Sequence, residues 1–535
     1  MKTLTNTILV GSIFLLLMSC MNSCALLHEH LKPAVKSESP QPTDTITIET
    51  GDLSGVYSSD GKVKVYAGIP YAAPPLGELR WKSPQPAKKW EGVRKADHFS
   101  AIAMQTRTPL PLARGVAKAL GTVAPEYYEP MDEDCLYLNV WAPARKSVEP
   151  YPVLVFIHGG ALRSGSGSED MYNGEEAARN GVIMVTINYR LGVFGYLSLP
   201  ELSEESGKGS GNYGLLDQIA ALEWVQRNIA KFGGDPSKVT VAGESAGSQS
   251  VSALCASPLA KDLFRAAIGE SATFVAPVLA SPLFTQDRAE QNGLKYMADC
   301  DATSLAELRA MKAEDLLKHE LSEISICVDG YALPELAWDI FAKGGQNDVA
   351  LLAGYNAEEG TLFTIGQNPS PESYDKSLRD IFGDKADAVK ALYPGTSKEE
   401  AKRSAEQITG LYSIGWPTWK WAEAQSKSGA CPTYLYYYTH VSSSGMQPFH
   451  GTEMSYAYFN PDTQTKWDNK DRTFARKMFT YWMNFVKTLN PNGNGLPRWQ
   501  SYQEAPNLIL ELGDSNIGMI PDPNQALYDL LDNEY

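Results

Sequence analysis

The sequence lacks the features that several classes of protein require. It has fewer basic than acidic residues, Lys+Arg 47 against Asp+Glu 63, so the net charge is −16 over 535 residues. A nucleic-acid-binding role is disfavoured, because binding phosphates requires a basic face. No C-x-x-C or other metal-type spacing occurs among the 7 cysteines, which argues against a zinc site. No internal repeat is visible.

The N-terminal apolar stretch is too short to cross a bilayer, which takes about 20 residues. It runs from Ile8 to Met18 and follows the positive charge of Lys2, which is the pattern of a secretory signal. Leu-Met-Ser-Cys ending at Cys20 resembles a bacterial lipobox, and Cys24 is a weaker alternative. An ordinary secretory peptide with incidental cysteines is the competing interpretation. We expect residues 1–24 to be a lipoprotein-type signal peptide.

The lipobox predicts an exported bacterial lipoprotein, anchored to a membrane through Cys20 and facing the periplasm or the cell surface. Residues 25–44 are rich in Pro, Ser, Lys and Glu, so we expect a disordered tether. The rest of the chain has ordinary hydrophobic content, 43% overall. We expect residues 45–535 to form a single large domain.

Apolar β-branched runs alternate with amphipathic helical patterns along this domain. This alternation predicts an α/β fold, a mostly parallel sheet covered by helices on both faces. An N-terminal hairpin is expected from Thr45–Val56 and Lys62–Tyr66, and helix-rich insertions are expected at about 275–345 and 368–430. The loop from Gln105 to Pro130 has no clear period and could lie over a cleft. The expected strands are Leu136–Trp141, Pro152–Ile157, Val182–Asn188, Val239–Ala242, Ala266–Ile268, Ala350–Gly354, Tyr434–Thr439 and Asn507–Leu512, and the main helices are Leu215–Ile229, Ala246–Ala256 and Phe474–Leu489.

The stretch Gly243-Glu244-Ser245-Ala246-Gly247 joins one of these strands to one of these helices. Strand, sharp turn and helix form the context in which a G-x-S-x-G serine acts as a nucleophile. The flanking glycines fit a tightly reversing backbone, and the helix directs its free N–H groups at the turn.

A serine nucleophile needs a base and an orienting acid, which follow this type of turn in the order Ser, acid, His. Three histidines follow Ser245 in the chain: His319, His440 and His450. His319 lies in a charged helical run and His440 ends a strand, whereas His450 lies in a Gly-containing loop beyond that strand. From position alone His450 is favoured, and His440 stays an alternative.

The acid and the groups that would stabilise an oxyanion have candidates as well. Glu358 and Glu359 directly follow the strand Ala350–Gly354. Gly159 and Gly160 follow the strand Pro152–Ile157, and a Gly-rich turn there can present backbone N–H groups to developing negative charge.

The chain from about residue 47 to the C-terminus resembles the type-B carboxylesterase family, the cholinesterase-like branch of the α/β-hydrolases that includes bacterial para-nitrobenzyl-esterase-like proteins. The resemblance is carried by several dense motifs. They are AGIPYAAPPLGELRWKSPQP, EDCLYLNVWAP, VFIHGGA, INYRLGVFGYL, GNYGLLDQIAALEWVQRNIAKFGGDP, VTVAGESAGS, AGYNAEEGT and FHGTEMSYAY. Together they are far more specific than the serine motif alone. The α/β-hydrolase fold, with helical insertions that form a gorge, is therefore expected.

The resemblance implies roles for individual residues. Ser245 corresponds to the nucleophile, Glu359 rather than Glu358 to the acid, and His450 to the base. The N–H groups of Gly160, Ala161 and Ala246 correspond to the oxyanion hole. Glu244, Ser271 and Glu453 stand where the family keeps polar residues that support the site. No metal and no cofactor is implied.

The resemblance also implies two disulfides, from which this sequence departs. Met104 stands near the partner position of Cys135, and Glu307 near that of Cys300, so neither bridge is expected. Their loss should loosen the loop between Met104 and Cys135. Five cysteines follow the signal segment, so at least one thiol is free: Cys135, Cys255, Cys300, Cys327 and Cys431.

The function that follows is hydrolysis of carboxylic esters by a serine hydrolase through an acyl-enzyme. The expected substrate is a small-molecule ester or an acylated carbohydrate. Alternatives are a non-catalytic cholinesterase-like binding module and a hydrolase of amides, carbamates or thioesters. No aromatic cage for a quaternary ammonium is evident, which argues against choline esters. The cluster Trp416, Trp419 and Trp421 could wall an acyl pocket, stack on a sugar or simply pack a helix.

Overall fold

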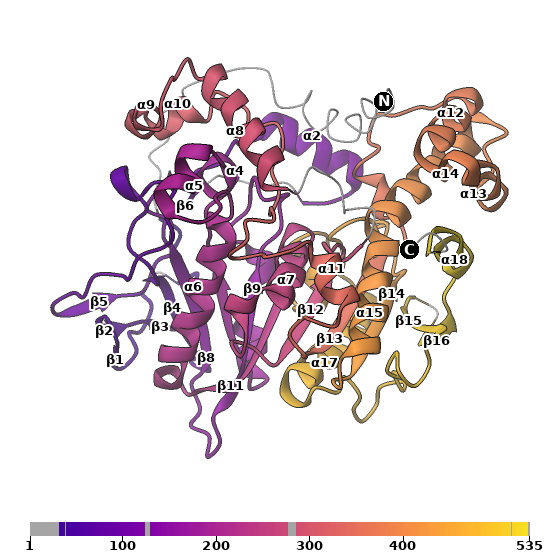
Figure 1. The fold of residues 1–535 in the computed structure, drawn as a ribbon. Helices are drawn as coiled ribbons and strands as arrows, with labels where there is room; N and C mark the ends of the chain where they lie inside the picture. Colours follow the sequence, from indigo (N-terminus) through magenta and orange to yellow (C-terminus); the bar gives the residue numbers. More distant parts are fainter. Residues whose placement is uncertain (1–30, 38, 124–128, 277–284, 515, 533–535) are drawn as a thin grey trace.

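The computed structural model describes residues 31–37, 39–123, 129–276, 285–514 and 516–532 (Figure 1). The predicted signal peptide, with Cys20 and Cys24, lies outside these residues. Within them, no helix is both long enough and apolar enough to cross a membrane.

One large twisted sheet runs through the molecule (Figure 1). Its neighbours from β15 to β10 are all parallel, and the strands beyond them on either edge are antiparallel. The predicted α/β-hydrolase architecture is confirmed. In spatial order the strands are β16 (Ile517–Pro521), β15 (Leu508–Leu512), β14 (Thr433–Tyr438), β13 (Ala350–Asn356), β12 (Ala266–Glu270), β11 (Gly234–Glu244), β9 (Tyr151–Ile157), β10 (Ile183–Ile187), β8 (Tyr137–Pro143), β4 (Val63–Pro70) and β3 (Val56–Tyr57).

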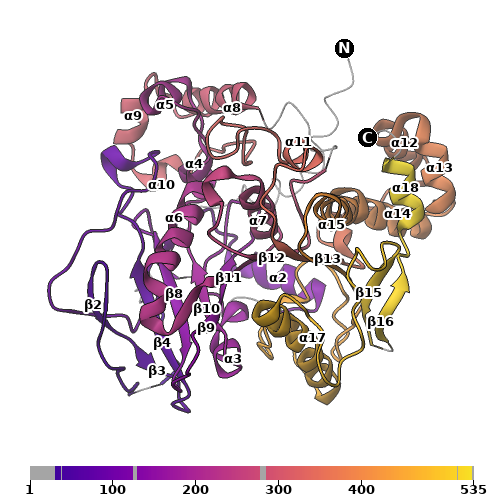
Figure 2. The same ribbon diagram turned by 60° about the horizontal axis from the view of Figure 1, so that its bottom comes forward.

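Helices cover both faces of the sheet, as Figure 2 shows. One face packs against α6 (Tyr213–Asn228), α7 (Ala246–Ala256) and α15 (Trp416–Ser428), and the other against α3 (Glu175–Arg179) and α17 (Asn469–Thr488). Strand residues alternate between the two faces, so a strand covered on both sides is apolar at every position.

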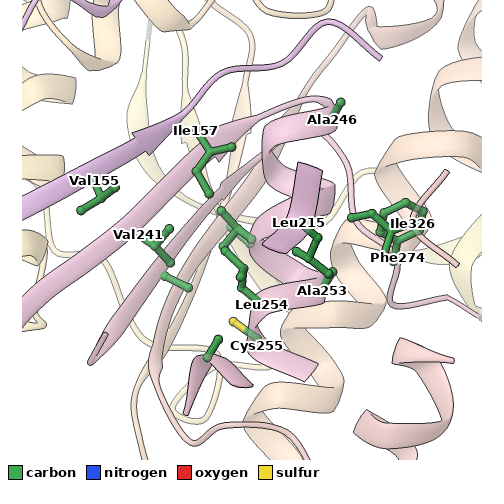
Figure 3. Close-up of a cluster of buried hydrophobic side chains, with 14 of the residues drawn as sticks. Val155, Ile157, Leu215, Val241, Ala246, Ala253, Leu254, Cys255, Phe274 and Ile326 are labelled. Atoms are coloured by element: carbon green, nitrogen blue, oxygen red, sulfur yellow. The ribbon is translucent and has the colours of Figure 1, made fainter. Parts of the chain in front are cut away.

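Strand β9 shows this alternation clearly. Val155 and Ile157 enter the core that contains Leu254 of α7, which Figure 3 shows, whereas Leu154 and Phe156 enter the core on the side of α17. All five side chains are fully buried. Burial of each stabilises the fold by roughly 1.5–3 kcal/mol relative to an exposed position. This packing fixes the strands whose ends carry the site.

Helical insertions follow β12 and β13, as predicted for about 275–345 and 368–430, of which residues 277–284 are not described. Trp416, Trp419 and Trp421 are 1%, 5% and 0% exposed, so this cluster packs α15 against the sheet and cannot stack on a sugar. The helices are α8 (Gln286–Asp299), α9 (Leu305–Ala310), α10 (Ala313–Leu316) and α11 (Ala337–Ala342) after β12, and α12 (Pro371–Phe382), α13 (Ala386–Leu392), α14 (Lys398–Gly410) and α15 after β13.

Besides α2, described below, four short helices of the described residues lie outside these insertions and the layers already described. They are α4 (Gly192–Tyr196), α5 (Pro200–Ser206), α16 (Met454–Ala457) and α18 (Gln525–Asp532).

The N-terminal hairpin prediction is wrong in detail. The chain turns back on itself at Glu49 and Thr50, so β1 (Ile46–Ile48) pairs with β2 (Gly51–Ser54) in a separate small sheet with β5 (Val93–Lys95). Gly51 has φ +148°, which suits this turn. Of the strands in the predicted N-terminal hairpin, β3 and β4 pair with each other in the large sheet.

The disordered tether predicted over 25–44 is wrong for its described part. The Phe99 N–H donates to the carbonyl of Lys32 (2.8 Å), and the Ala34 N–H donates to the carbonyl of Asp97 (2.9 Å). Ala34 and Val35 are 4% and 5% exposed, in a small core beside β3 and β4. These two apolar residues bury themselves although the surrounding composition is polar.

The aperiodic stretch Gln105–Pro130, predicted as a loop, contains the helix α2 (Leu110–Leu120). Gly115 lies in the interior of α2 and lowers its intrinsic helix propensity, whereas Pro111 lies in the first turn, where a helix tolerates proline. The short strands β6 (Ile102–Ala103) and β7 (Met131–Asp132), which precede and follow this stretch in the sequence, pair with each other in parallel.

Candidate active site

Ser245 lies in a strained turn between β11 and α7. Its φ is +56° and its ψ −123°, a conformation that a residue with a side chain rarely adopts. The Ser245 N–H donates to the carbonyl of Glu270 at the end of β12, 2.8 Å away. The neighbouring strand therefore holds the turn, as the predicted strand–turn–helix context requires.

The two glycines of this turn have no room for a side chain. A Cβ on Gly243 would lie 2.5 Å from the carbonyl carbon of Gly247, and one on Gly247 would lie 2.1 Å from the carbonyl oxygen of Ile157. Helix α7 starts so close to β9 and β11 that only glycine fits at both positions.

The structure brings together three side chains that lie far apart in the sequence. The His450 Nε2 is 2.8 Å from the Ser245 Oγ, and its Nδ1 is 2.6 Å from the Glu359 Oε2. The alternative base, His440, lies elsewhere: its Nε2 is 3.0 Å from the Asp471 Oδ1, and its ring stacks on Phe474. Of the histidines after Ser245, His450 contacts the serine.

The two candidate glutamates differ in burial. Glu359 begins a short 3₁₀ turn (Glu359–Thr361) after β13 and is 2% exposed, whereas Glu358 is exposed. The Glu358 N–H donates to the carbonyl of Pro448 (2.9 Å), which ties this turn to the loop of His450. The backbone of Glu358 thus sets the spacing at which Glu359 and His450 meet.

Asn356, which the sequence analysis did not single out, joins the acid to the rest of the site. Its backbone N–H donates to the Glu359 Oε1 (2.7 Å), and its side-chain amide donates to the Phe449 carbonyl (2.9 Å) and to Glu453. The hydroxyl of Ser271 donates to the other oxygen of Glu453 (3.3 Å). Asn356 is the last residue of β13, and its position at the carboxyl end of a strand is the only sequence signal for this role.

Buried glutamates lie close to the imidazole of His450. The Glu244 Oε1 lies 3.4 Å from the His450 Nε2. Burial lowers the pKa of His450, but the charges of Glu244 and Glu359 outweigh it and raise the pKa to about 9. Burial, together with the charges of Glu453 and Glu359, raises the pKa of Glu244 to about 8 against the opposing effect of His450. Burial and the charge of Glu359 raise the pKa of Glu453 to about 7.

The Gly-rich turn after β9 runs beside the serine. A Cβ on Gly159 would lie 3.1 Å from the Ser245 Cβ. Gly160 and Ala161 have φ values of +99° and +56° and are exposed, and the Arg163 and Ser164 N–H groups close the turn on the Gly160 carbonyl (2.9 and 3.0 Å).

The three N–H groups predicted for the oxyanion hole, those of Gly160, Ala161 and Ala246, donate to no acceptor among the described residues. They are therefore available to a ligand. Ala246 is the first residue of α7, so the positive end of a helix dipole adds to its N–H.

None of the described cysteines is in a disulfide. Cys135 and Met104 are both buried and line one small cavity.

Comparisons with known proteins give this arrangement its family. The profile of the carboxylesterase family matches residues 42–529. The para-nitrobenzyl esterase of Bacillus subtilis (strain 168) is 35% identical over 503 residues, covering 89% of this chain and 96% of the relative. The fumonisin B1 esterase of Sphingopyxis macrogoltabida is 34% identical over 502 residues, covering 88% and 86%.

A solved structure of PNB esterase superposes with a TM-score of 0.77 at 32% identity, over 92% of this chain and 99% of that one. The chain therefore belongs to the carboxylesterase family and is a carboxylic-ester hydrolase for small-molecule esters.

Proposed function

We propose that the chain hydrolyses carboxylic esters through an acyl-enzyme on Ser245, with His450 as the base and Glu359 as the acid that orients it. The observation that carries the proposal is the position of one imidazole, with one nitrogen 2.8 Å from the serine hydroxyl and the other 2.6 Å from a buried carboxylate. A serine hydroxyl is a weak nucleophile until a base removes its proton as it attacks.

In the acylation step the Ser245 Oγ attacks the ester carbonyl carbon while the His450 Nε2 takes the hydroxyl proton. The carbonyl oxygen becomes an oxyanion, which the N–H groups of Gly160, Ala161 and Ala246 stabilise. Glu359 accepts a hydrogen bond from Nδ1, so it fixes the tautomer and stabilises the imidazolium. The C–O bond to the alcohol then breaks, and His450 gives its proton to the leaving oxygen.

In the deacylation step His450 acts again as a base. It takes a proton from water, whose oxygen attacks the acyl carbon, and it then returns the proton to the Ser245 Oγ as the carboxylic acid leaves. Neither the acylation step nor the deacylation step, as proposed, uses a metal or a cofactor. The same residues would serve both steps, in keeping with microscopic reversibility.

Covalent labelling tests this proposal. A fluorophosphonate should modify the protein in a 1:1 ratio and abolish esterase activity, and peptide mapping should place the adduct on Ser245. A non-catalytic binding module would resist labelling. An adduct on another serine, accompanied by loss of activity, would overturn the assignment.

The charge of Glu244 should control the pH dependence of the reaction. His450 must be neutral to accept a proton, so kcat/KM should rise with pH as His450 loses its proton. Because the pKa of His450 is raised, this rise should occur at high pH. Glu244→Gln removes a negative charge beside Nε2, which lowers the pKa of His450. The rising limb of the kcat/KM profile should therefore move to lower pH.

Glu270→Gln serves as the control for this pH prediction. Glu270 is a buried carboxylate that bonds to Tyr458 (2.8 Å) and Trp482 (3.0 Å) rather than to His450, so its substitution should move the limb less. A limb that stays in place, or moves to higher pH, in Glu244→Gln would show that Glu244 does not set the protonation of the base.

A further inference from the structure

The rim segment, which we define as Gln105–Val123 with α2 at its centre, is fastened at its first residue to the oxyanion turn, Gly160–Ser164. The Gln105 side chain bonds both backbone groups of Gly165, the residue after that turn. Its Oε1 accepts from the Gly165 N–H (2.9 Å), and its Nε2 donates to the Gly165 carbonyl (3.0 Å). The Nε2 also donates to the Ala103 carbonyl (3.0 Å), and the side chain is buried.

The other end of the rim segment is fastened to the loop of His450 through Gln464. The Gln464 carbonyl accepts from the Val123 N–H (2.7 Å) and the Thr122 hydroxyl (2.9 Å). The Gln464 side chain then donates from Nε2 to the carbonyl of Gly451, the neighbour of His450 (2.7 Å), and accepts at Oε1 from the Ser455 N–H (3.1 Å).

These two anchors are non-covalent. Met104, not a cysteine, precedes Gln105, and the described cysteines form no disulfide. Amide side chains hold both ends of the rim segment by hydrogen bonds. The loosening of the loop between Met104 and Cys135 stays a prediction. Each anchor bonds to backbone groups on both sides, so each fixes the position of a loop rather than of one side chain.

We propose that Gln105 and Gln464 are positioning residues for ester hydrolysis, and that the rim segment links them. Gln105 holds the oxyanion turn through Gly165, and Gln464 holds the imidazole of His450 through Gly451. The rim segment keeps the oxyanion turn and the loop of His450 at fixed positions relative to Ser245. The inference rests on the proposed roles of Ser245, His450 and the oxyanion turn. A displacement of about 1 Å in a reacting group can cost about a hundredfold in rate.

Gln464→Met tests the second anchor, because methionine keeps the side-chain volume but loses both bonds, while the backbone bonds to Thr122 and Val123 remain. We expect kcat to fall about tenfold or more with little change in KM. The pH profile should also move, because a displaced imidazole sits differently between Glu359 and Glu244.

The matched control is Gln503→Met. Gln503 makes the same kind of backbone bridge at the opposite end of β14, accepting from the Thr433 N–H (3.1 Å) and donating to the Cys431 carbonyl (2.9 Å). It should affect stability alone. If Gln464→Met behaves like Gln503→Met, with kcat and pH profile unchanged, Gln464 is merely structural and the proposal fails.

Gln105→Met tests the first anchor with a different readout. A trifluoromethyl ketone forms a hemiketal on the serine whose oxyanion occupies the oxyanion hole, so its affinity reports the geometry of that turn. Affinity for the ketone and kcat/KM should fall together, by about tenfold or more, with the pH profile unchanged. If Gln105→Met does not fold, Gln105→Glu keeps the acceptor for Gly165 and loses the donor. Unchanged affinity for the ketone in a folded variant would overturn the proposed positioning role of Gln105.

The double variant tests the link between the anchors. Two residues that act through one segment are coupled, so the combined loss of kcat/KM should be smaller than the product of the two single losses. A loss equal to the product would show independent anchors. Fluorophosphonate labelling of Ser245 separates this inference from the proposed function: labelled variants with unchanged kinetics refute the anchors alone, whereas unlabelled wild-type protein refutes the proposed function.

Discussion

Ser245→Ala should lower kcat/KM for a carboxylic ester by about a million-fold, to the level at which only binding and the oxyanion hole act on attack by water. Alanine keeps a Cβ, so the strain at φ +56° stays and the turn is unchanged. The bond from the residue 245 N–H to the Glu270 carbonyl (2.8 Å) also stays. Steady-state kinetics and thermal unfolding together check this result.

The folded state is the control for this variant, because loss of activity with loss of structure would say nothing about chemistry. We expect an unfolding midpoint close to that of the wild type. A folded Ser245→Ala protein that retains substantial turnover would contradict the assignment of the nucleophile.

Glu359→Gln should lower kcat by about a thousandfold to ten-thousandfold. An amide in place of the carboxylate no longer stabilises the imidazolium that forms during attack. It can also present its NH₂ group to Nδ1, which favours the tautomer with a proton on Nε2, the nitrogen that must accept the serine proton. KM should change little, because Glu359 is buried behind the imidazole.

The neighbouring residue provides a matched control for Glu359→Gln. Glu358→Gln makes the same chemical change one residue away, on an exposed side chain whose backbone bonds remain. It should leave kcat within about twofold. Equal losses in the two variants would show that Glu359 acts through the general charge of the turn and not through its contact with His450.

Much of the fold and of the candidate site could be predicted from local sequence. Continuous apolar runs such as β9 are visible because both faces of the sheet are covered, and the glycines around Ser245 are required by close backbone contacts. Chain order limits the base to a few histidines, and the family resemblance then distinguishes Glu359 from Glu358. The structure adds the physical reason, which is that one carboxylate is buried and the other is exposed.

The remainder depends on contacts between distant segments, which no local pattern reveals. Asn356 and Gln464 resemble ordinary loop amides until the fold places them beside Glu453 and Gly451. Helix α2 has a glycine, Gly115, in its interior, and the segment that contains it is anchored at Gln105 and at Thr122 and Val123. The segment around Ala34 is polar on average, but two of its side chains fit a small core beside β3.

The position of the acyl group during turnover tests the central claim most directly. Rapid acid quenching of the enzyme with an activated ester such as p-nitrophenyl butyrate, followed by peptide mass spectrometry, should find a butyryl group on Ser245 within the first turnover. The group should persist while the substrate lasts, disappear once the substrate is exhausted, and be absent in Ser245→Ala. Hydrolysis at full rate with no acyl adduct at residue 245, or with the adduct on another residue, would contradict the account.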